Sequence, residues 1–263
     1  MNLELTGKVA WVTGGSGGIG SAIAAALAAE GADVAVSGRK PGPLEEQAAE
    51  IAAASGQRVI AVPADVTDKN AVDQAAEAIS GRLGGIDILV NTAATPLAGT
   101  GGSLETVSDQ QLLTGLDEKV VGYLRTSQAA VPSMKRRGWG RLIHVGGLLA
   151  RQASSYAPRN LAIVHLSKTL SDELGPYGIT SNVVHPGATR GARLAESLAS
   201  RAQARNVSEA ELEAELAAAY AIRRLLNPAE IAHVVTFLAS PLSAAITGES
   251  IGTGGGITQM VTI

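Results

Sequence analysis

The stretch TGGSGGIG at residues 13–20 follows an apolar run at 9–12 and precedes a helix-forming segment. Glycine suits a sharp turn from a strand into a helix. Gly14 permits a positive φ, Gly18 lets a phosphate approach the backbone, and Gly20 lets the helix pack closely on the strand. The free N–H groups and the positive dipole end of such a helix attract an anion.

The residues after this stretch complete a strand–helix–strand unit. Apolar residues recur at four-residue spacing along the expected helix, Gly31 closes it, and a second apolar strand follows at 34–36. A bare glycine pattern is also compatible with an ordinary tight turn. The strand before it and the helix and strand after it favour a pyrophosphate site.

The composition is that of a globular α/β protein that binds a small molecule. The 263 residues are 46% hydrophobic and 17% charged, with a net charge of −3, and a single domain over 1–263 is expected. The basic residues form no long cluster, which argues against nucleic-acid and membrane partners. Without cysteine, a signal core or a long apolar run, the sequence predicts a soluble cytoplasmic protein.

The spelling TGxxxGxG near the start of a chain of this length resembles the short-chain dehydrogenase/reductase family. Further similar segments are NTAA at 91–94, GRLIHVGG at 140–147, LSKTLSDELGPYGIT at 166–180 and HPG at 185–187. The resemblance implies a Rossmann-type, doubly wound parallel sheet of about seven strands with helices on both faces. It also implies a helical substrate flap at about 190–222 and a homodimer or homotetramer.

The residues after the second strand indicate which cofactor is bound. An NAD(H) enzyme usually has a carboxylate there for the ribose hydroxyls, whereas the chain has Ser37, Arg39 and Lys40, which favour NADP(H). The two cations can also be ordinary solvated loop residues. Asp65 is predicted to contact the cofactor or, alternatively, to cap a helix. Asn91 is expected to support the sheet as well as the cofactor edge. The predicted cofactor contacts are Gly14, Ser16, Gly18, Ile19, Gly20, Ser37, Arg39, Lys40, Asp65, Val66, Asn91, Asn160, Pro186 and Gly187.

The expected catalytic residues are incomplete. The family uses a Tyr for proton exchange, a Lys that lowers the pKa of that Tyr, a Ser that orients the substrate oxygen, and an Asn that anchors a water chain. The resemblance assigns the Tyr to Tyr156. It places Asn160 at the Lys position, Gly147 at the Ser position and Lys119 at the Asn position.

Losing the lysine matters because a free phenol has a pKa near 10 and is almost entirely neutral at pH 7. A cation about 4 Å away, at an effective dielectric constant of about 20, contributes up to about 4 kcal/mol, or roughly three pKa units. Alcohol oxidation needs the phenolate and suffers most, whereas carbonyl reduction uses the neutral phenol. We therefore expect reduction, and we hypothesise that Lys119 is the cation that tunes Tyr156 while Asn160 bonds the nicotinamide ribose. The alternative is a solvated Lys119 in a degenerate site.

Other side chains are weaker candidates for the missing roles. Ser154 or Ser155 can replace the missing hydroxyl or simply cap the helix, and His185 lies at the end of a strand, where ligands bind in open sheets. His144, His165 and His233 are expected to be structural. No cluster of His or carboxylate residues has metal-ligand spacing.

Three functions are compatible with these residues. The first is an NADP(H)-dependent oxidoreductase that reduces the carbonyl, enone or imine of a small molecule, with Tyr156 as proton donor. The second is a nucleotide-binding but catalytically degenerate member that acts as a regulator or scaffold. The third is a non-redox enzyme on the same fold, against which the intact TGGSGGIG counts.

Overall fold

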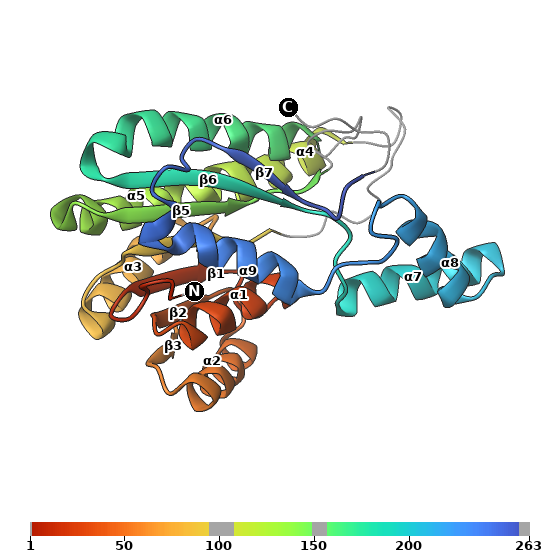
Figure 1. Cartoon of the computed structure of the whole chain (residues 1–263), viewed down its shortest axis with the longest axis horizontal. Helices are drawn as coiled ribbons and strands as arrows, with labels where there is room; N and C mark the ends of the chain where they lie inside the picture. The colour runs from red at the N-terminus through yellow and green to blue at the C-terminus, as the bar shows by residue number, and fades with distance from the viewer. Residues whose placement is uncertain (1, 95–107, 149–156, 258–263) are drawn as a thin grey trace.

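The structure, a computed structural model, describes residues 2–94, 108–148 and 157–257. Its strands form one parallel sheet of seven strands in the order β3-β2-β1-β4-β5-β6-β7 (Figure 1). Parallel order with a reversal between β1 and β4 is the doubly wound Rossmann arrangement, so the predicted fold class is confirmed. The strands are β1 (Val9–Thr13), β2 (Asp33–Ser37), β3 (Val59–Ala61), β4 (Ile88–Asn91), β5 (Gly140–Val145), β6 (Ile179–Pro186) and β7 (Ser250–Thr253).

Helices cover both faces of the sheet (Figure 1). One face carries α1 (Gly18–Ala29), α2 (Pro41–Ser55) and α9 (Pro228–Ala239), and the other carries α3 (Lys69–Leu83), α5 (Gly122–Arg137) and α6 (Ala157–Leu174). The remaining α-helices are α4 (Asp109–Leu116), α7 (Ala192–Arg205) and α8 (Glu209–Ala218). In the described parts of the chain, no helix is long and apolar enough to cross a membrane.

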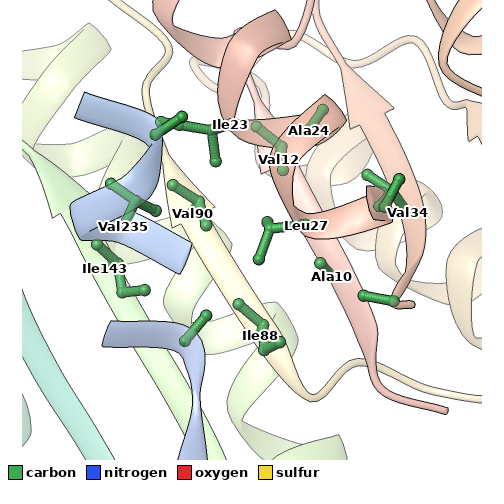
Figure 2. Close-up of a cluster of buried hydrophobic side chains, with 14 of the residues drawn as sticks. Ala10, Val12, Ile23, Ala24, Leu27, Val34, Ile88, Val90, Ile143 and Val235 are labelled. Atoms are coloured by element: carbon green, nitrogen blue, oxygen red, sulfur yellow. The ribbon is translucent and has the colours of Figure 1, made fainter. Parts of the chain in front are cut away.

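The core under α1 and α9 is built from alternate residues of the central strands. Figure 2 shows Val12, Val90 and Ile143 from three neighbouring strands pointing at Ile23 and Leu27 of α1 and at Val235 of α9. Because successive side chains of a strand alternate between faces, the other residues of the same strands pack under α3, α5 and α6. Burial on both faces explains why these strands read as continuous apolar runs.

The long helix expected after residue 108 is confirmed but is not continuous. Ser108 caps α4 through the predicted capping box with Gln111. Residues 117–121 then form a π-helical turn, in which the N–H of Gly122 bonds the carbonyl of Asp117, five residues back. Lys119 lies at the centre of that turn, and π turns of this kind occur frequently at functional sites.

The segment predicted as a helical flap forms two helices that extend away from the sheet (Figure 1). Ser208 begins α8 with the expected capping box to Glu211, and buried leucines pack α7 against α8. Arg190 forms an ion pair with Glu213 of α8. What this pair of helices covers remains a prediction.

Candidate active site

The loop between β1 and α1 has the geometry predicted from its glycines. Gly14 has a φ of 67°, and a Cβ on Gly20 would lie 2.2 Å from the carbonyl oxygen of Gly14. A Cβ on Gly18, by contrast, would have no heavy atom of the described chain within 4 Å. Among the described residues, no side chain caps α1 and no acidic residue lies in its first turn. The exposed N–H groups and the open surface at Gly18 fit an anionic group.

Gly15 is a further requirement of this loop that the sequence reasoning missed. A Cβ there would lie 2.6 Å from the Cβ of Val36, and the Gly15 N–H donates to the carbonyl of Ser37 at 3.0 Å. The loop is therefore pressed against the end of β2. The loop and β2 are separate segments of the sequence, so their close approach leaves no local sequence signal.

The three residues predicted to bind a 2′-phosphate do not lie together. Ser37 is the last residue of β2, whereas Arg39 and Lys40 follow the strand. Ser37 is buried, and its hydroxyl accepts the indole N–H of Trp11 at 2.8 Å. This geometry does not support the predicted phosphate contact of Ser37, because the side chain faces the core. Arg39 and Lys40 lie beyond the strand and are exposed. A Cβ on Gly38 would lie 3.7 Å from Ser16 Oγ, so this segment adjoins the glycine loop.

Asp65 and Val66 form a turn at the carboxyl end of β3. The carboxylate of Asp65 accepts the N–H and the hydroxyl of Thr67, at 2.9 and 2.8 Å. The cap of α3 is Asp68, so the alternative that Asp65 caps this helix is wrong. Arg125 of α5 donates to the carbonyl of Val66 at 3.2 Å, which ties the turn to the helix.

Asn91 belongs to a buried polar row at the ends of the central strands. Its Oδ1 accepts the hydroxyl of Thr126 at 2.8 Å and lies 3.4 Å from Thr13 Oγ1, and its Nδ2 lies 3.2 Å from His144 Nδ1. Ser181 is 3.4 Å from the other ring nitrogen of His144. These contacts agree with the predicted role of Asn91 in supporting the sheet, while its cofactor contact remains a prediction.

His144 is a structural residue in this geometry. The ring is fully buried and stacks on Tyr123, with the centroids 5.7 Å apart. Burial lowers the pKa of His144 to about 4, so the imidazole is neutral at physiological pH. Burial also raises the pKa of Tyr123, whose neutral phenol donates to the carbonyl of Val145 at 3.1 Å.

Lys119 lies inside the protein, against the end of β5. Its ammonium donates to the carbonyl of Gly146 at 2.8 Å and to Oδ1 of Asn160 at 2.9 Å, and only 4% of the residue is exposed. Tyr123, one turn later, binds the preceding carbonyl of β5. Lys119 is therefore not a solvated helix residue.

Asn160 lies in the first turn of α6 and is buried as well. The structure thus brings together two of the three predicted catalytic residues, which are 41 positions apart in the sequence. Tyr156 lies outside the described residues, as do Ser154 and Ser155, so their predicted roles remain predictions.

The backbone next to this pair is held by His185. Its Nδ1 lies 3.1 Å from the amide nitrogen of Gly147 and 3.0 Å from the carbonyl oxygen of the same residue. A Cβ on Gly146 would lie 2.5 Å from this ring nitrogen, so only glycine allows the ring to pack there. His185 thus supports the turn after β5, a role that sequence reasoning did not foresee.

Pro186 ends β6, and Gly187 directly after it lies against the loop that follows β7. A Cβ on Gly187 would be 2.9 Å from the Cα of Gly254. His165 and His233 are exposed on α6 and α9, away from these residues. Across residues 2–94, 108–148 and 157–257, no group of three or more His, Asp or Glu side chains is arranged to hold a metal ion.

Known proteins are similar to this chain in sequence over most of its length. The family profile described as enoyl-(acyl carrier protein) reductase matches residues 14–258. The short-chain reductase protein NovJ of Streptomyces niveus is 36% identical over 95% of this chain and 93% of its own length. The 2,3-dihydro-2,3-dihydroxybenzoate dehydrogenase of Bacillus subtilis is 31% identical over 97% of each chain.

Solved structures of this family have the same fold as this chain. The L-sorbose reductase of Gluconobacter frateurii, complexed with NADPH and L-sorbose, superposes with a TM-score of 0.93 at 29% identity, over 99% of this chain and 100% of its own. Fold, profile and relatives agree over nearly the whole length, and the chain therefore belongs to the short-chain dehydrogenase/reductase family of oxidoreductases.

Proposed function

We propose that this protein is an NADP(H)-dependent reductase that converts the carbonyl group of a small molecule to an alcohol, with Tyr156 as proton donor. The observation that carries the proposal is the buried Lys119, whose ammonium lies 2.9 Å from Asn160 at the start of α6. Burying an ammonium is costly, and buried ionisable side chains cluster at functional sites. An exposed Lys119 would instead have favoured a degenerate site.

The described residues fit the proposed cofactor. The uncapped start of α1 and the open surface at Gly18 suit its pyrophosphate; Ser16 lies in the loop before α1 and Ile19 in the first turn of the helix. Arg39 and Lys40 supply positive charge beside that loop, as a 2′-phosphate requires. The structure of L-sorbose reductase contains NADPH, which supports the same preference here. Asp65, Val66, Pro186 and Gly187 complete the proposed contacts.

The proposed roles of the side chains follow from position and charge. The cofactor, when bound, supplies the hydride that reduces the carbonyl carbon. Tyr156 gives its phenolic proton to the carbonyl oxygen, and the positive charge of Lys119 stabilises the phenolate left behind. Asn160 and the Gly146 carbonyl hold the ammonium in place. Charge is thus kept at the site although the lysine comes from the long helix rather than from α6.

The proposal is tested by NADPH oxidation with a panel of simple ketones, such as cyclohexanone, acetophenone and ethyl acetoacetate. Lys119→Ala should lower turnover and move the basic limb of the rate profile to higher pH, because the phenol loses a neighbouring cation. Tyr156→Phe should abolish proton transfer. Lys168→Ala is the matched control, because Lys168 is an exposed lysine of α6 paired with Asp172.

Two results would contradict this proposal. A wild-type protein that consumes no NADPH with any ketone would favour the regulatory or scaffold function. Lys119→Ala with unchanged turnover and pH profile would reject the role of the lysine.

Arg39 provides the test of cofactor choice. Arg39→Ala should weaken NADPH binding at least about tenfold and leave NADH binding nearly unchanged, since a charge-assisted contact contributes roughly 1.5 to 3 kcal/mol. Arg58→Ala serves as control, because Arg58 is an exposed arginine paired with Asp33. Equal losses for the two cofactors in calorimetry would reject the assignment.

A further inference from the structure

The orientation of the Asn160 carboxamide is fixed by its neighbour. An ammonium group is only a donor, so the atom 2.9 Å from Lys119 Nζ must be the carboxamide oxygen. The carboxamide nitrogen therefore faces away from Lys119. Asn160 is 4% exposed, which leaves the group little freedom to turn.

The nitrogen faces the space above Gly147. A Cβ built on Gly147 would meet Nδ2 of Asn160 at 3.1 Å, before the Cγ at 3.8 Å and Oδ1 at 3.9 Å. The backbone of Gly147 is itself positioned by the ring of His185, at 3.0 and 3.1 Å. A hydrogen-bond donor from α6 thus borders the space into which a side chain at position 147 would extend.

We infer that Asn160 Nδ2 is the donor that holds the substrate's carbonyl oxygen, at the place where the family has a serine hydroxyl. The inference rests on the proposed function. A carbonyl oxygen gains negative charge as hydride reaches its carbon, and a positioned N–H stabilises that charge without giving up its proton. The proton still comes from Tyr156. The carboxamide nitrogen carries two hydrogens, so one can serve the ribose and the other the substrate.

This assignment explains why positions 119, 147 and 160 differ together from the family pattern. Lysine at 119 fixes the carboxamide, the carboxamide supplies the donor, and glycine at 147 leaves room for it. Serine at 147 would press on the amide nitrogen at 3.1 Å and force it to move by a few tenths of an ångström. Gly147→Ser alone should therefore not raise activity.

The experiment compares Asn160→Ala with Asn160→Ala/Gly147→Ser. Both variants deprive Lys119 of the same partner, so their difference reports the donor alone. Asn160→Ala should lower kcat about 10²-fold, the usual effect of removing one donor from a developing oxyanion. Serine at 147, placed in the vacated space, should restore activity at least about tenfold. Gly147→Ser in the wild-type background should bring no gain, so the two substitutions should be non-additive.

Binding provides a readout that is independent of turnover. NADP⁺ has no hydride to give, so the affinity of cyclohexanone for the NADP⁺-saturated protein can be measured by calorimetry. It should fall about tenfold in Asn160→Asp, whose carboxylate keeps the contact with Lys119 but places an acceptor above Gly147. NADP⁺ affinity is measured separately, because the proposed ribose contact of Asn160 is also lost, and each titration is made at saturating NADP⁺. Thermal unfolding of each variant establishes that it is folded.

The outcomes separate this inference from the proposed function. Wild-type activity together with full activity in Asn160→Ala, or with no gain on adding serine at 147, would overturn the inference and leave the reductase in place. Unchanged cyclohexanone affinity in Asn160→Asp would also overturn it. A wild-type protein that binds no NADPH and reduces no ketone would overturn both.

Discussion

At the residue scale, Lys119 and Asn160 place a buried ammonium beside a carboxamide. Desolvation disfavours a buried ammonium, and the contacts with Gly146 and Asn160 offset part of that cost. The same contacts fix where the charge lies. The resemblance to the family predicts asparagine at position 119 and lysine at position 160, and the structure shows the side chains of Lys119 and Asn160 in contact.

His144 gives a residue-scale prediction for stability against pH. Its pKa is lowered to about 4 in the folded protein, against about 6.5 in the unfolded chain. The unfolded chain therefore binds more protons between these values, and folding stability should fall as pH drops from about 6.5 towards 4. The loss attributable to His144 is on the order of 3 kcal/mol.

Urea unfolding between pH 4.5 and 7 measures this effect. His144→Gln should be less stable at pH 7, because the row with Asn91 and Ser181 is disturbed, but its stability should depend less on pH. His165→Gln, at an exposed position of α6, should keep the wild-type slope. Equal slopes for His144→Gln and the wild type would contradict the assignment.

At the scale of single elements, the π-helical turn at 117–121 decides where the long helix points its side chains. Lys119 and Tyr123 bind consecutive carbonyls at the end of β5, those of Gly146 and Val145. A Cβ on Gly122 would lie 3.0 Å from Val66, so the helix also packs tightly against the turn after β3. The wide turn thus lets one helix support both the proposed catalytic site and the proposed cofactor site.

The start of α1 allows a matched pair of glycine substitutions. Gly20→Ala should destabilise the fold by about 1 to 3 kcal/mol, because its Cβ would lie 2.2 Å from the Gly14 carbonyl oxygen. Gly18→Ala should leave unfolding nearly unchanged, since its Cβ meets no heavy atom of the described chain. It should nevertheless weaken NADPH binding, because a methyl group would stand on the proposed pyrophosphate surface. Chemical unfolding and NADPH titration of both variants test this, and full NADPH affinity in Gly18→Ala would place the pyrophosphate elsewhere.

For the whole molecule, the apolar side chains exposed on α4 and α6 bear on assembly. Leu113 is 59% exposed and Leu161 49% exposed. We expect the long helix after residue 108 and the helix α6 to pair with a second copy, as the family resemblance implies, and exposed apolar side chains are consistent with such an interface. The predicted homodimer or homotetramer would cover them.

Light scattering at micromolar concentration should therefore give a dimeric or tetrameric mass. Leu113→Glu/Leu161→Glu should lower that mass, because burying two carboxylates in an apolar interface is unfavourable. Val207→Glu is the control, at an exposed apolar residue between α7 and α8. A monomeric wild type would contradict the prediction, and an unchanged mass in the double variant would place the interface elsewhere.

Local patterns in the sequence were sufficient for the elements and their order. Apolar periodicity, the glycine loop and the capping residues Ser108 and Ser208 act over a few neighbouring positions, so they can be read without the fold. The π turn at 117–121 was not foreseen, because it depends on how the helix packs against other elements.

The sequence by itself therefore determined the Rossmann architecture, the glycine loop between β1 and α1, and the positions at which the resemblance predicts other residues. Only the tertiary structure decided that Ser37 faces the core, that His185 supports Gly147, and that Lys119 reaches Asn160. The physical reason is the number of sequence positions over which each interaction acts. Turn and helix preferences arise from residues within about four positions, whereas the distance between side chains on separate helices is set by how those helices pack on the sheet.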